Sequence, residues 1–463
     1  MDLEKRNLYQ HCEERAPVQR RTHVHRTIAR LALALLIAAG LRHWINSTMG
    51  SGCTKRIDAA TLAPAHAGHC LSIPPIGVVE FRERQKKLAG VLNGLGAAAY
   101  ITEPGANAFY FTNVSRSQWG ASERPFLLIV TPQPGSNGTA ADLTVLTPKF
   151  EETRARLLTI PAPESGLHFV AWKEEVDPYA TTLDAIIAAS GLSEGTIFVD
   201  EAARFFIASR LATSTSRFRV EIAPPEIRAL RESKSTAEIM LMTCANEATL
   251  LAIRYTRELM HIGIKASETF KIMQRAMSEA GLVSGFALVL FGEDAARPHG
   301  GGVDRTLAKD ELVLIDAGGS LHGYESDITR TFALPESEIP SRNLELWFIV
   351  RDAQDAAAAA ARADAVAGDV DKAARDVITK AGFGEYYTHR TGHGIGIEGH
   401  EDPYLRGNNN VRLVAGMAFS DEPGIYIDGK VGVRLEDIFV IDLGGARFLT
   451  DAVGGRAMDP WHP

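Results

Sequence analysis

Residues 311–332 read Glu311-Leu-Val-Leu-Ile-Asp316-Ala-Gly-Gly-Ser-Leu-His-Gly-Tyr-Glu-Ser-Asp327-Ile-Thr-Arg-Thr-Phe332. One apolar run ends on Asp316, and a second β-rich run begins just after Asp327. With glycines between them, the two runs predict a β-hairpin. A hairpin returns Asp327 towards Asp316, so two carboxylates meet at one end of a sheet. Because like charges that close repel each other, the pair indicates either a bound cation or a solvated surface turn.

Further chemistry-bearing residues follow in the second half of the chain. The segment His389-Arg-Thr-Gly-His393-Gly-Ile-Gly-Ile-Glu-Gly-His400-Glu401 carries three histidines in a glycine-rich loop and strand, and Ser420-Asp-Glu422-Pro-Gly-Ile-Tyr-Ile follows it. Residues 431–441 then predict a strand, on which Arg434 and Glu436 share one face with an apolar residue. An acid on the core side of a strand is costly unless Arg434 pairs it or a metal binds it.

These segments supply five candidate metal ligands: Asp316, Asp327, His393, Glu422 and Glu436. A set of oxygen donors with one imidazole suits Mn²⁺, and Co²⁺ or Zn²⁺ are also compatible with it. Four ionised carboxylates need counter-charge, which two divalent cations would provide. Pairs of metal ions activate water in aminopeptidases, so the set predicts a hydrolase with two divalent metal ions, of which Mn²⁺ is preferred.

The order and neighbours of these residues resemble the pita-bread metallopeptidases, and within them the Xaa-Pro aminopeptidases and prolidases. Residues 389–401 look like the proline-peptidase signature of that family, departing from it at Gly399, where Ile or Val is usual. The resemblance is strong over residues 226–463 and weak over 75–225. It implies an α+β fold, with a C-terminal pita-bread domain and a smaller α/β N-terminal domain.

The resemblance also implies a role for each matching residue. Asp316 would bind one metal through both oxygens, Asp327 and Glu436 would bridge the two metals, and His393 and Glu422 would complete the second. A bridging hydroxide would attack the scissile carbonyl of an Xaa-Pro bond.

The remaining roles implied by the resemblance concern substrate and proton. Glu422 would also act as general base, His299 and His400 would contact the substrate around the scissile bond, and Arg434 would orient a bridging carboxylate. His400 lies seven residues beyond His393, which is too far along an extended strand for both to bind one ion directly unless the chain folds back. We expect a peptide substrate with proline at the second position and, from the resemblance, a homodimer.

Two other functions are compatible with the sequence. A metal-dependent hydrolase of a small non-peptide amide would use the same residues. A non-catalytic binding protein on the same fold is disfavoured because all five candidate ligands are present.

The bulk composition limits the remaining choices. The chain has 463 residues with 49 Lys+Arg against 57 Asp+Glu, a formal charge of −8, which argues against a nucleic-acid partner. We predict a tail and linker over residues 1–74, an α/β domain over 75–225 and a catalytic domain over 226–463. Strands are predicted at 97–102, 108–112, 126–131 and 143–147, and helices at 235–260, 267–280 and 347–367. Ser235 and Glu238 have the spacing of a capping box.

The N-terminal tail predicts membrane targeting. A basic segment precedes the apolar run 31–41, and residues 28–45 as a whole resemble a signal or anchor segment. This pattern favours a single-pass membrane protein or a secreted one, with a cytoplasmic location as the alternative. Four cysteines, at 12, 53, 70 and 244, form no Cys-x-x-Cys pair, and Cys53 with Cys70 predicts either one disulfide or free thiols.

Overall fold

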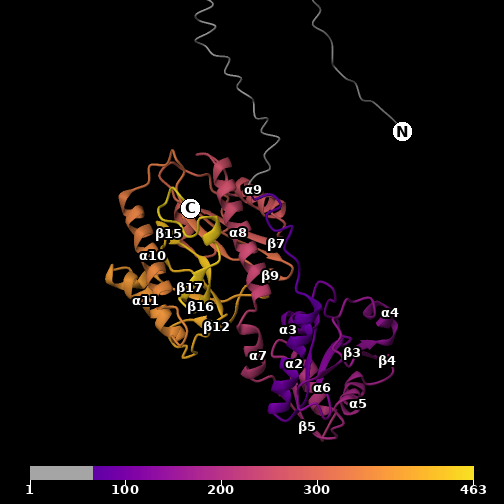
Figure 1. Ribbon diagram of the computed structural model, residues 1–463. Coiled ribbons are helices and arrows are strands. Elements are labelled where there is room, and N and C mark those ends of the chain that lie inside the picture. The colour runs from indigo at the N-terminus through magenta and orange to yellow at the C-terminus, as the bar shows by residue number, and fades with distance from the viewer. Residues whose placement is uncertain (1–65) are drawn as a thin grey trace, which may run out of the picture. The chain divides into compact units, whose positions relative to one another are not determined.

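The computed structural model describes residues 66–463, which belong to one compact unit. The first elements in chain order build a six-stranded sheet with its helices (Figure 1). They are α2 (Val78–Gly94), β1 (Ala97–Thr102), α3 (Ala106–Thr112), β2 (Leu127–Pro132), β3 (Ala141–Pro148), η1 (Lys149–Glu151), α4 (Glu152–Ala155), β4 (Leu167–Trp172), α5 (Pro178–Ser190), β5 (Gly195–Val199), α6 (Phe205–Thr213) and β6 (Phe218–Ile222). The strand order is β4-β3-β2-β1-β5-β6.

Strand β2 shows why this sheet is buried on both faces. Leu128 and Val130 pack in the cluster that contains Leu88 and Leu92 of α2. The alternate residues Leu127 and Ile129 pack in the cluster that contains residues of α5 and α6. Successive side chains of a strand point to opposite faces, so a strand covered by helices on both sides is apolar throughout.

One predicted strand of this region is wrong. Residues 108–112 belong to helix α3, not to a strand. The aromatic residues there favour a strand by propensity, but tertiary packing overrides that preference. Within one helical turn, Ala108 and Phe111 both reach the apolar cluster beside α2, and the helix ends at Asn113 in a left-handed conformation with φ of 62°.

The following elements form the part of the chain that carries the site residues. They are α7 (Pro225–Glu232), α8 (Thr236–Leu259), α9 (Ala266–Glu279), β7 (Val283–Phe291), η2 (Gly292–Ala296), β8 (Val313–Leu321), β9 (Tyr324–Glu325), β10 (Ile328–Phe332), α10 (Ser341–Ala360), α11 (Ala367–Lys380), η3 (Gly384–Tyr386), β11 (Gly392–Gly394), β12 (Glu401–Leu405), β13 (Ala418–Asp421), β14 (Gly424–Ile427), β15 (Val431–Arg434), β16 (Asp437–Asp442), β17 (Gly445–Phe448) and η4 (Asp451–Val453). A pair of long helices precedes a group of strands twice. The strand groups are β10-β8-β7, with β9 on β8, and β12-β11-β13-β16-β17, while β14 pairs with β15.

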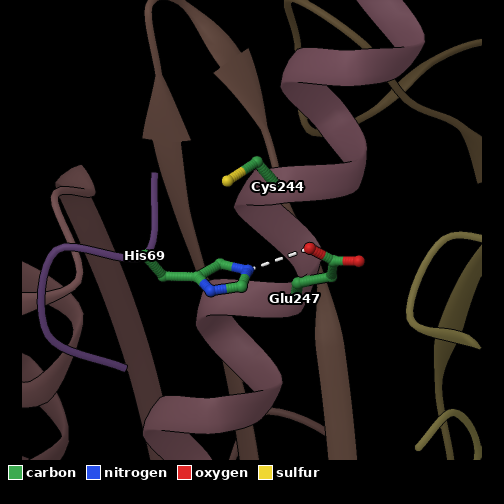
Figure 2. A group of neighbouring side chains, drawn as sticks. All are labelled: His69, Cys244 and Glu247. Atoms are coloured by element: carbon green, nitrogen blue, oxygen red, sulfur yellow. Dashed lines mark hydrogen bonds and ion pairs between the residues drawn. The ribbon is translucent and has the colours of Figure 1, made fainter. Parts of the chain in front are cut away.

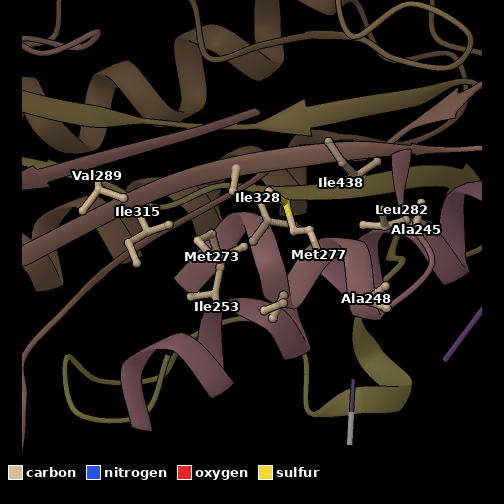
Figure 3. Packing of buried hydrophobic residues seen from close by; sticks show 14 of the residues in the cluster. Ala245, Ala248, Ile253, Met273, Met277, Leu282, Val289, Ile315, Ile328 and Ile438 are labelled. Atoms are coloured by element: carbon tan, nitrogen blue, oxygen red, sulfur yellow. The ribbon is translucent and has the colours of Figure 1, made fainter. Parts of the chain in front are cut away.

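Each helix pair covers its own strands. Figure 3 shows Ile253 of α8 and the methionines of α9 packed against sheet residues such as Ile315 and Ile328. Helices α10 and α11 pack in a second cluster with Phe419 and Phe439. Helix α8 begins with the predicted capping box, in which Ser235 Oγ accepts from the Glu238 amide at 3.2 Å and a Glu238 carboxylate oxygen accepts from the Ser235 amide at 2.9 Å. Helix α10 ends at Ala360, earlier than predicted, and Asp364 beyond it is left-handed with φ of 67°.

The hairpin predicted at residues 311–332 is confirmed. Strands β8 and β10 pair antiparallel, with Asp316 opposite Thr329 and Ala317 opposite Ile328. Gly323 forms the turn with φ of 87°, and a Cβ there would lie 2.4 Å from the ring of Phe109. Both the conformation and the close approach therefore require glycine at this position.

The strand predicted over residues 431–441 is interrupted. It separates into β15, which pairs with β14, and β16, which pairs with β13. Glu436 lies between them, and its amide donates to the Thr329 carbonyl of β10 at 3.0 Å. Glu436 therefore occupies the point at which the chain passes from one strand group to another.

The membrane and signal-anchor assignment is corrected by the structure. Across residues 66–463, no helix combines the length and the apolar character needed to cross a membrane. Residues 28–45, from which that prediction came, lie outside the described residues. The pairing of Cys53 with Cys70 also fails, because Cys70 is bonded to Cys244. A domain boundary near residue 225 stays a prediction.

Candidate metal centre

The five predicted ligands come from separate strands and turns that meet at one place. Asp316 lies in β8, His393 in β11, Asp327 just before β10, Glu422 just after β13 and Glu436 between β15 and β16. Ligand atoms of Asp316, Asp327 and Glu436 lie within 4.8 Å of one another, as do those of His393, Glu422 and Glu436. Because Glu436 belongs to both groups, the structure brings all five residues into one cluster.

Burial makes this cluster electrostatically costly without a cation. Asp327 and Glu436 are 7% and 2% exposed. Burial first, and then the neighbouring carboxylates, raise the pKa of both residues well above their usual range. Burial also raises the pKa of Glu422 to about 7. Asp316 Oδ1 is a buried oxygen without a hydrogen-bond partner in the described structure. An unpartnered carboxylate oxygen among protonatable acids fits a site for divalent cations.

Arg434 is the guanidinium that holds the cluster together. It donates from Nη2 to Asp316 Oδ2 at 2.6 Å and from Nε to Thr329 Oγ1 at 3.1 Å. Thr329 Oγ1 in turn donates to Glu436 Oε2 at 2.6 Å. Arg434 Nη1 also donates to Tyr426 Oη at 3.0 Å. The predicted orienting role of Arg434 thus has a geometric basis, directly for Asp316 and through Thr329 for Glu436.

His393 presents an unprotonated nitrogen to the acids. Its Nδ1 lies 3.0 Å from the Gly394 carbonyl oxygen, which can only accept, so Nδ1 carries the proton. Its Nε2 lies 3.4 Å from Glu422 Oε1 and 3.8 Å from Asp327 Oδ2. Burial lowers the pKa of His393 to about 3, so the ring is neutral. A neutral imidazole with a free Nε2 is the form that binds metals.

The other three histidines of the site, His299, His389 and His400, all line the same cavity. The His400 ring lies 4.1 Å from the His393 ring, centroid to centroid, and His400 joins Asp327 and His393 in a third group of close ligand atoms. The sequence allowed His400 to approach His393 only if the chain folds back between them, and residues 395–400 do fold back. His299 is exposed in the same cavity. His389 Nε2 lies 2.8 Å from Tyr426 Oη, and burial lowers the pKa of His389 to about 4.

Sequence reasoning missed three residues that support the site: Thr329, Tyr426 and Lys234. Lys234 Nζ donates to Glu401 Oε1 at 2.5 Å, and both side chains are buried. This ion pair anchors the residue that follows His400. Thr329 and Tyr426 lie within four positions of the predicted ligands Asp327 and Glu422 in the sequence. That proximity is the one sequence feature that indicates a role for them. The Lys234 pair spans 167 positions, so local patterns give no indication of it.

The cluster opens into a cavity of about 1640 Å³. Its lining includes all five predicted ligands, the two histidines His299 and His400, and the arginines Arg390 and Arg406. The cavity is large enough for a short peptide. Four carboxylates and one imidazole at its base suit hard or borderline divalent cations, and such ions promote hydrolysis.

Comparisons with known proteins agree with this chemistry. Residues 240–442 match the model of metallopeptidase family M24. An uncharacterized peptidase of Schizosaccharomyces pombe is 38% identical over 392 residues, which cover 83% of each chain. Among solved structures, dipeptidase PepE from Mycobacterium ulcerans has a TM-score of 0.74 at 30% identity, covering 84% of this chain and 99% of that one. A prolidase from Thermococcus sibiricus has a TM-score of 0.68 at 28% identity, covering 80% and 96%. The chain therefore belongs to metallopeptidase family M24, has its pita-bread fold and is a metallopeptidase.

Proposed function

We propose that this metallopeptidase uses two divalent metal ions to hydrolyse the peptide bond between an N-terminal residue and proline. The observation that carries the proposal is the convergence of Asp316, Asp327, His393, Glu422 and Glu436 at the base of one cavity. The similarity to solved dipeptidase and prolidase structures supports it. The preferred metal is Mn²⁺, since oxygen donors dominate the set. A homodimer remains a prediction from family resemblance.

The ligands would divide between two ions through shared carboxylates. Glu436 belongs to both close groups, and Asp327 lies near Asp316 as well as His393, so these two acids would bridge the ions. When bound, the ions would supply Lewis-acid activation of water and of the scissile carbonyl. Arg434 would keep the Asp316 carboxylate turned into the cluster through its 2.6 Å contact.

The remaining groups would manage the proton and orient the substrate. The Glu422 carboxylate is the proposed general base, because it reaches the cavity and its raised pKa lets it hold a proton near neutral pH. His299 and His400, in the cavity wall, would donate hydrogen bonds to substrate oxygens. The substrate can reach them because both side chains are exposed.

Metal binding is expected to weaken as the pH falls below about 7. Burial raises the pKa of Glu422 to about 7 and also raises the pKa of Asp327 and Glu436, so these carboxyls bind protons more tightly in the metal-free site than ordinary acids do. These protons must leave when a cation binds. His393, with a pKa of about 3, has no proton to release. For each proton released on binding, the metal affinity falls about tenfold when the pH is lowered by one unit.

Calorimetric titration of the metal-free enzyme with Mn²⁺ at about pH 6 and pH 7, in buffers of different ionisation enthalpy, measures both the affinity and the protons released. A metal affinity independent of pH, with no proton release, would contradict the protonated state of these carboxyls.

Two arginines in the cavity suit the free carboxylate of a dipeptide. Arg390 and Arg406 flank the ring of Tyr404, with guanidinium carbons 4.6 and 5.7 Å from its centroid. Within residues 66–463, neither arginine forms a salt bridge. Arg375, which also lines the cavity, is by contrast held by Asp371. Two unpaired guanidinium groups favour an anionic group at the far end of the substrate, and hence Xaa-Pro dipeptides.

Arg406→Ala is therefore expected to raise KM for an Xaa-Pro dipeptide about 10- to 100-fold, the usual range for losing a charged hydrogen bond. The same dipeptide with an amidated C-terminus should show little change, because it lacks the carboxylate. Arg412→Ala is the matched control, since Arg412 is exposed and its side chain donates to the Asp364 carbonyl. An equal increase in KM for the dipeptide and for its amide would show that Arg406 does not bind the carboxylate.

The substrate class is tested by comparing hydrolysis of four compounds by the Mn²⁺-loaded enzyme: an Xaa-Pro dipeptide, a longer peptide with proline second, a dipeptide without proline and a small non-peptide amide. We expect the first to be cleaved fastest. Preference for the dipeptide without proline would replace the Xaa-Pro proposal by a general dipeptidase. Preference for the non-peptide amide would indicate a metabolite hydrolase.

A further inference from the structure

The disulfide between Cys70 and Cys244 joins two segments that are distant in the sequence, and neither cysteine belongs to the proposed carboxylate cluster. Cys70 lies in the turn at residues 66–72, Cys244 lies on α8, and 174 positions separate them. The two Cα atoms are 5.8 Å apart, and both side chains are buried. The two sulfurs have no role in the proposed hydrolysis.

Two further metal-binding side chains flank the disulfide. His69 precedes Cys70, and Glu247 follows Cys244 by three positions, on the same face of α8. His69 Nε2 lies 2.9 Å from a Glu247 carboxylate oxygen, and Figure 2 shows both groups beside the Cys244 sulfur. Ligand atoms of His69, Cys244 and Glu247 all lie within 4.8 Å of one another. With Cys70, two sulfurs, one imidazole nitrogen and one carboxylate oxygen therefore converge.

We propose that these four side chains form a zinc site when the disulfide is reduced. A dithiol reductant would supply two electrons and two protons to the sulfur–sulfur bond, producing two thiols and its own disulfide. Zn²⁺ would then displace one proton from each thiol and bind both sulfurs, His69 Nε2 and Glu247. Four donors of these types match the tetrahedral preference of Zn²⁺. Mn²⁺, which prefers oxygen, would favour the carboxylate cluster instead.

The turn remains docked without the disulfide, and so the donors stay together. The Gly68 amide donates to the Glu279 carbonyl at 2.9 Å, and His66 Nε2 lies 3.2 Å from the Glu279 carboxylate. The His66 ring also packs on Tyr255 of α8, with centroids 4.3 Å apart. These contacts hold residues 66–69 against α8 and α9 independently of the sulfurs. A site held in place before binding loses less entropy when the metal binds.

Helix α8 connects this cluster to the metal centre. Asn246 and Thr249 follow Cys244 on α8 within two helical turns. Asn246 Oδ1 accepts from the Asp327 amide at 3.2 Å, and Thr249 Oγ1 lies 2.7 Å from Ser326 Oγ. Closing the link between the turn and α8, by zinc or by the disulfide, therefore stabilises the helix that holds Asp327. We expect the reduced protein with zinc to unfold at a temperature near that of the oxidised protein, and the reduced zinc-free protein to unfold earlier.

The test uses the full-length chain with Cys12 and Cys53 replaced by serine and the catalytic centre saturated with Mn²⁺. A phosphine reduces the disulfide, and Co²⁺ is then added as a spectroscopic substitute for zinc. We expect one equivalent of Co²⁺ to give a thiolate-to-cobalt charge-transfer absorption, which oxygen and imidazole ligands do not produce. Zn²⁺ should abolish this absorption and protect both thiols from alkylation.

His69→Ala and Glu247→Gln keep both cysteines and test the other two donors. Each should weaken Co²⁺ binding at least about tenfold, since even residues outside the ligand shell contribute that much to metal affinity. Cys70→Ser, which leaves Cys244 as the single thiolate of the site, should weaken the absorption. Far-ultraviolet circular dichroism checks that each variant is folded. Absence of the charge-transfer band in the folded reduced protein, or unchanged affinity in both His69→Ala and Glu247→Gln, would overturn the proposal.

Discussion

Asp327→Asn is expected to abolish peptidase activity and to lower the metal content of the purified enzyme. A neutral amide cannot bridge two cations as a carboxylate does. Asp327 lies close both to Asp316 with Glu436 and to His393 with His400, so its loss removes the acid shared between these groups. Metal analysis and the rate of Xaa-Pro hydrolysis measure the two effects.

In the metal-free state, Asp327→Asn is not expected to lower the thermal stability of the protein. Burial and the neighbouring acids raise the pKa of Asp327, so its ionised form is unfavourable there and Asn removes that cost. The metal-free variant should therefore unfold at the same temperature as the metal-free wild type, or at a higher one. Asp200→Asn controls for the replacement of a buried acid by its amide outside the cluster, because Asp200 is a buried acid of the six-stranded sheet region. Full metal content and wild-type rate in Asp327→Asn would refute the dinuclear assignment.

His400→Ala is expected to reduce turnover about 10²- to 10³-fold, the usual cost of losing one preorganised donor to a developing oxyanion. The loss should appear mainly in kcat, since the hydrogen bond strengthens in the transition state. Metal content and thermal stability should remain close to wild type. His168→Ala, at an exposed position in the six-stranded sheet, controls for removal of a histidine.

The geometry makes the metal measurement decisive for His400. One of its ring nitrogens lies within 4.8 Å of ligand atoms of Asp327 and His393, the same limit within which the proposed ligands are grouped. Loss of one equivalent of metal from His400→Ala would identify His400 as a ligand and remove it from the substrate contacts. Full activity with full metal content would leave His400 without either role.

Much of the candidate site could be predicted because its ligands stand in short motifs. Asp316 and Asp327 both lie in one hairpin, Asp316 within its first strand and Asp327 just before its last. The register of a hairpin follows from its turn and its alternating apolar pattern. The capping box at Ser235 was likewise predictable, since both partners lie within one helical turn. Local patterns failed where packing overrode them, as at residues 108–112, and where a chain reversal brought His400 back to His393.

By itself, the sequence determined the identity of the five candidate ligands, the hairpin that carries two of them and the resemblance to a peptidase family. These follow from residue type and spacing along a few turns of chain. The tertiary structure decided which distant groups meet: the Lys234–Glu401 ion pair, the Arg434–Thr329–Glu436 chain and the Cys70–Cys244 bond. Such contacts join segments about a hundred or more positions apart, and their partners are selected by burial, which makes an unpaired charge or polar group costly. No pattern within either segment specifies that choice.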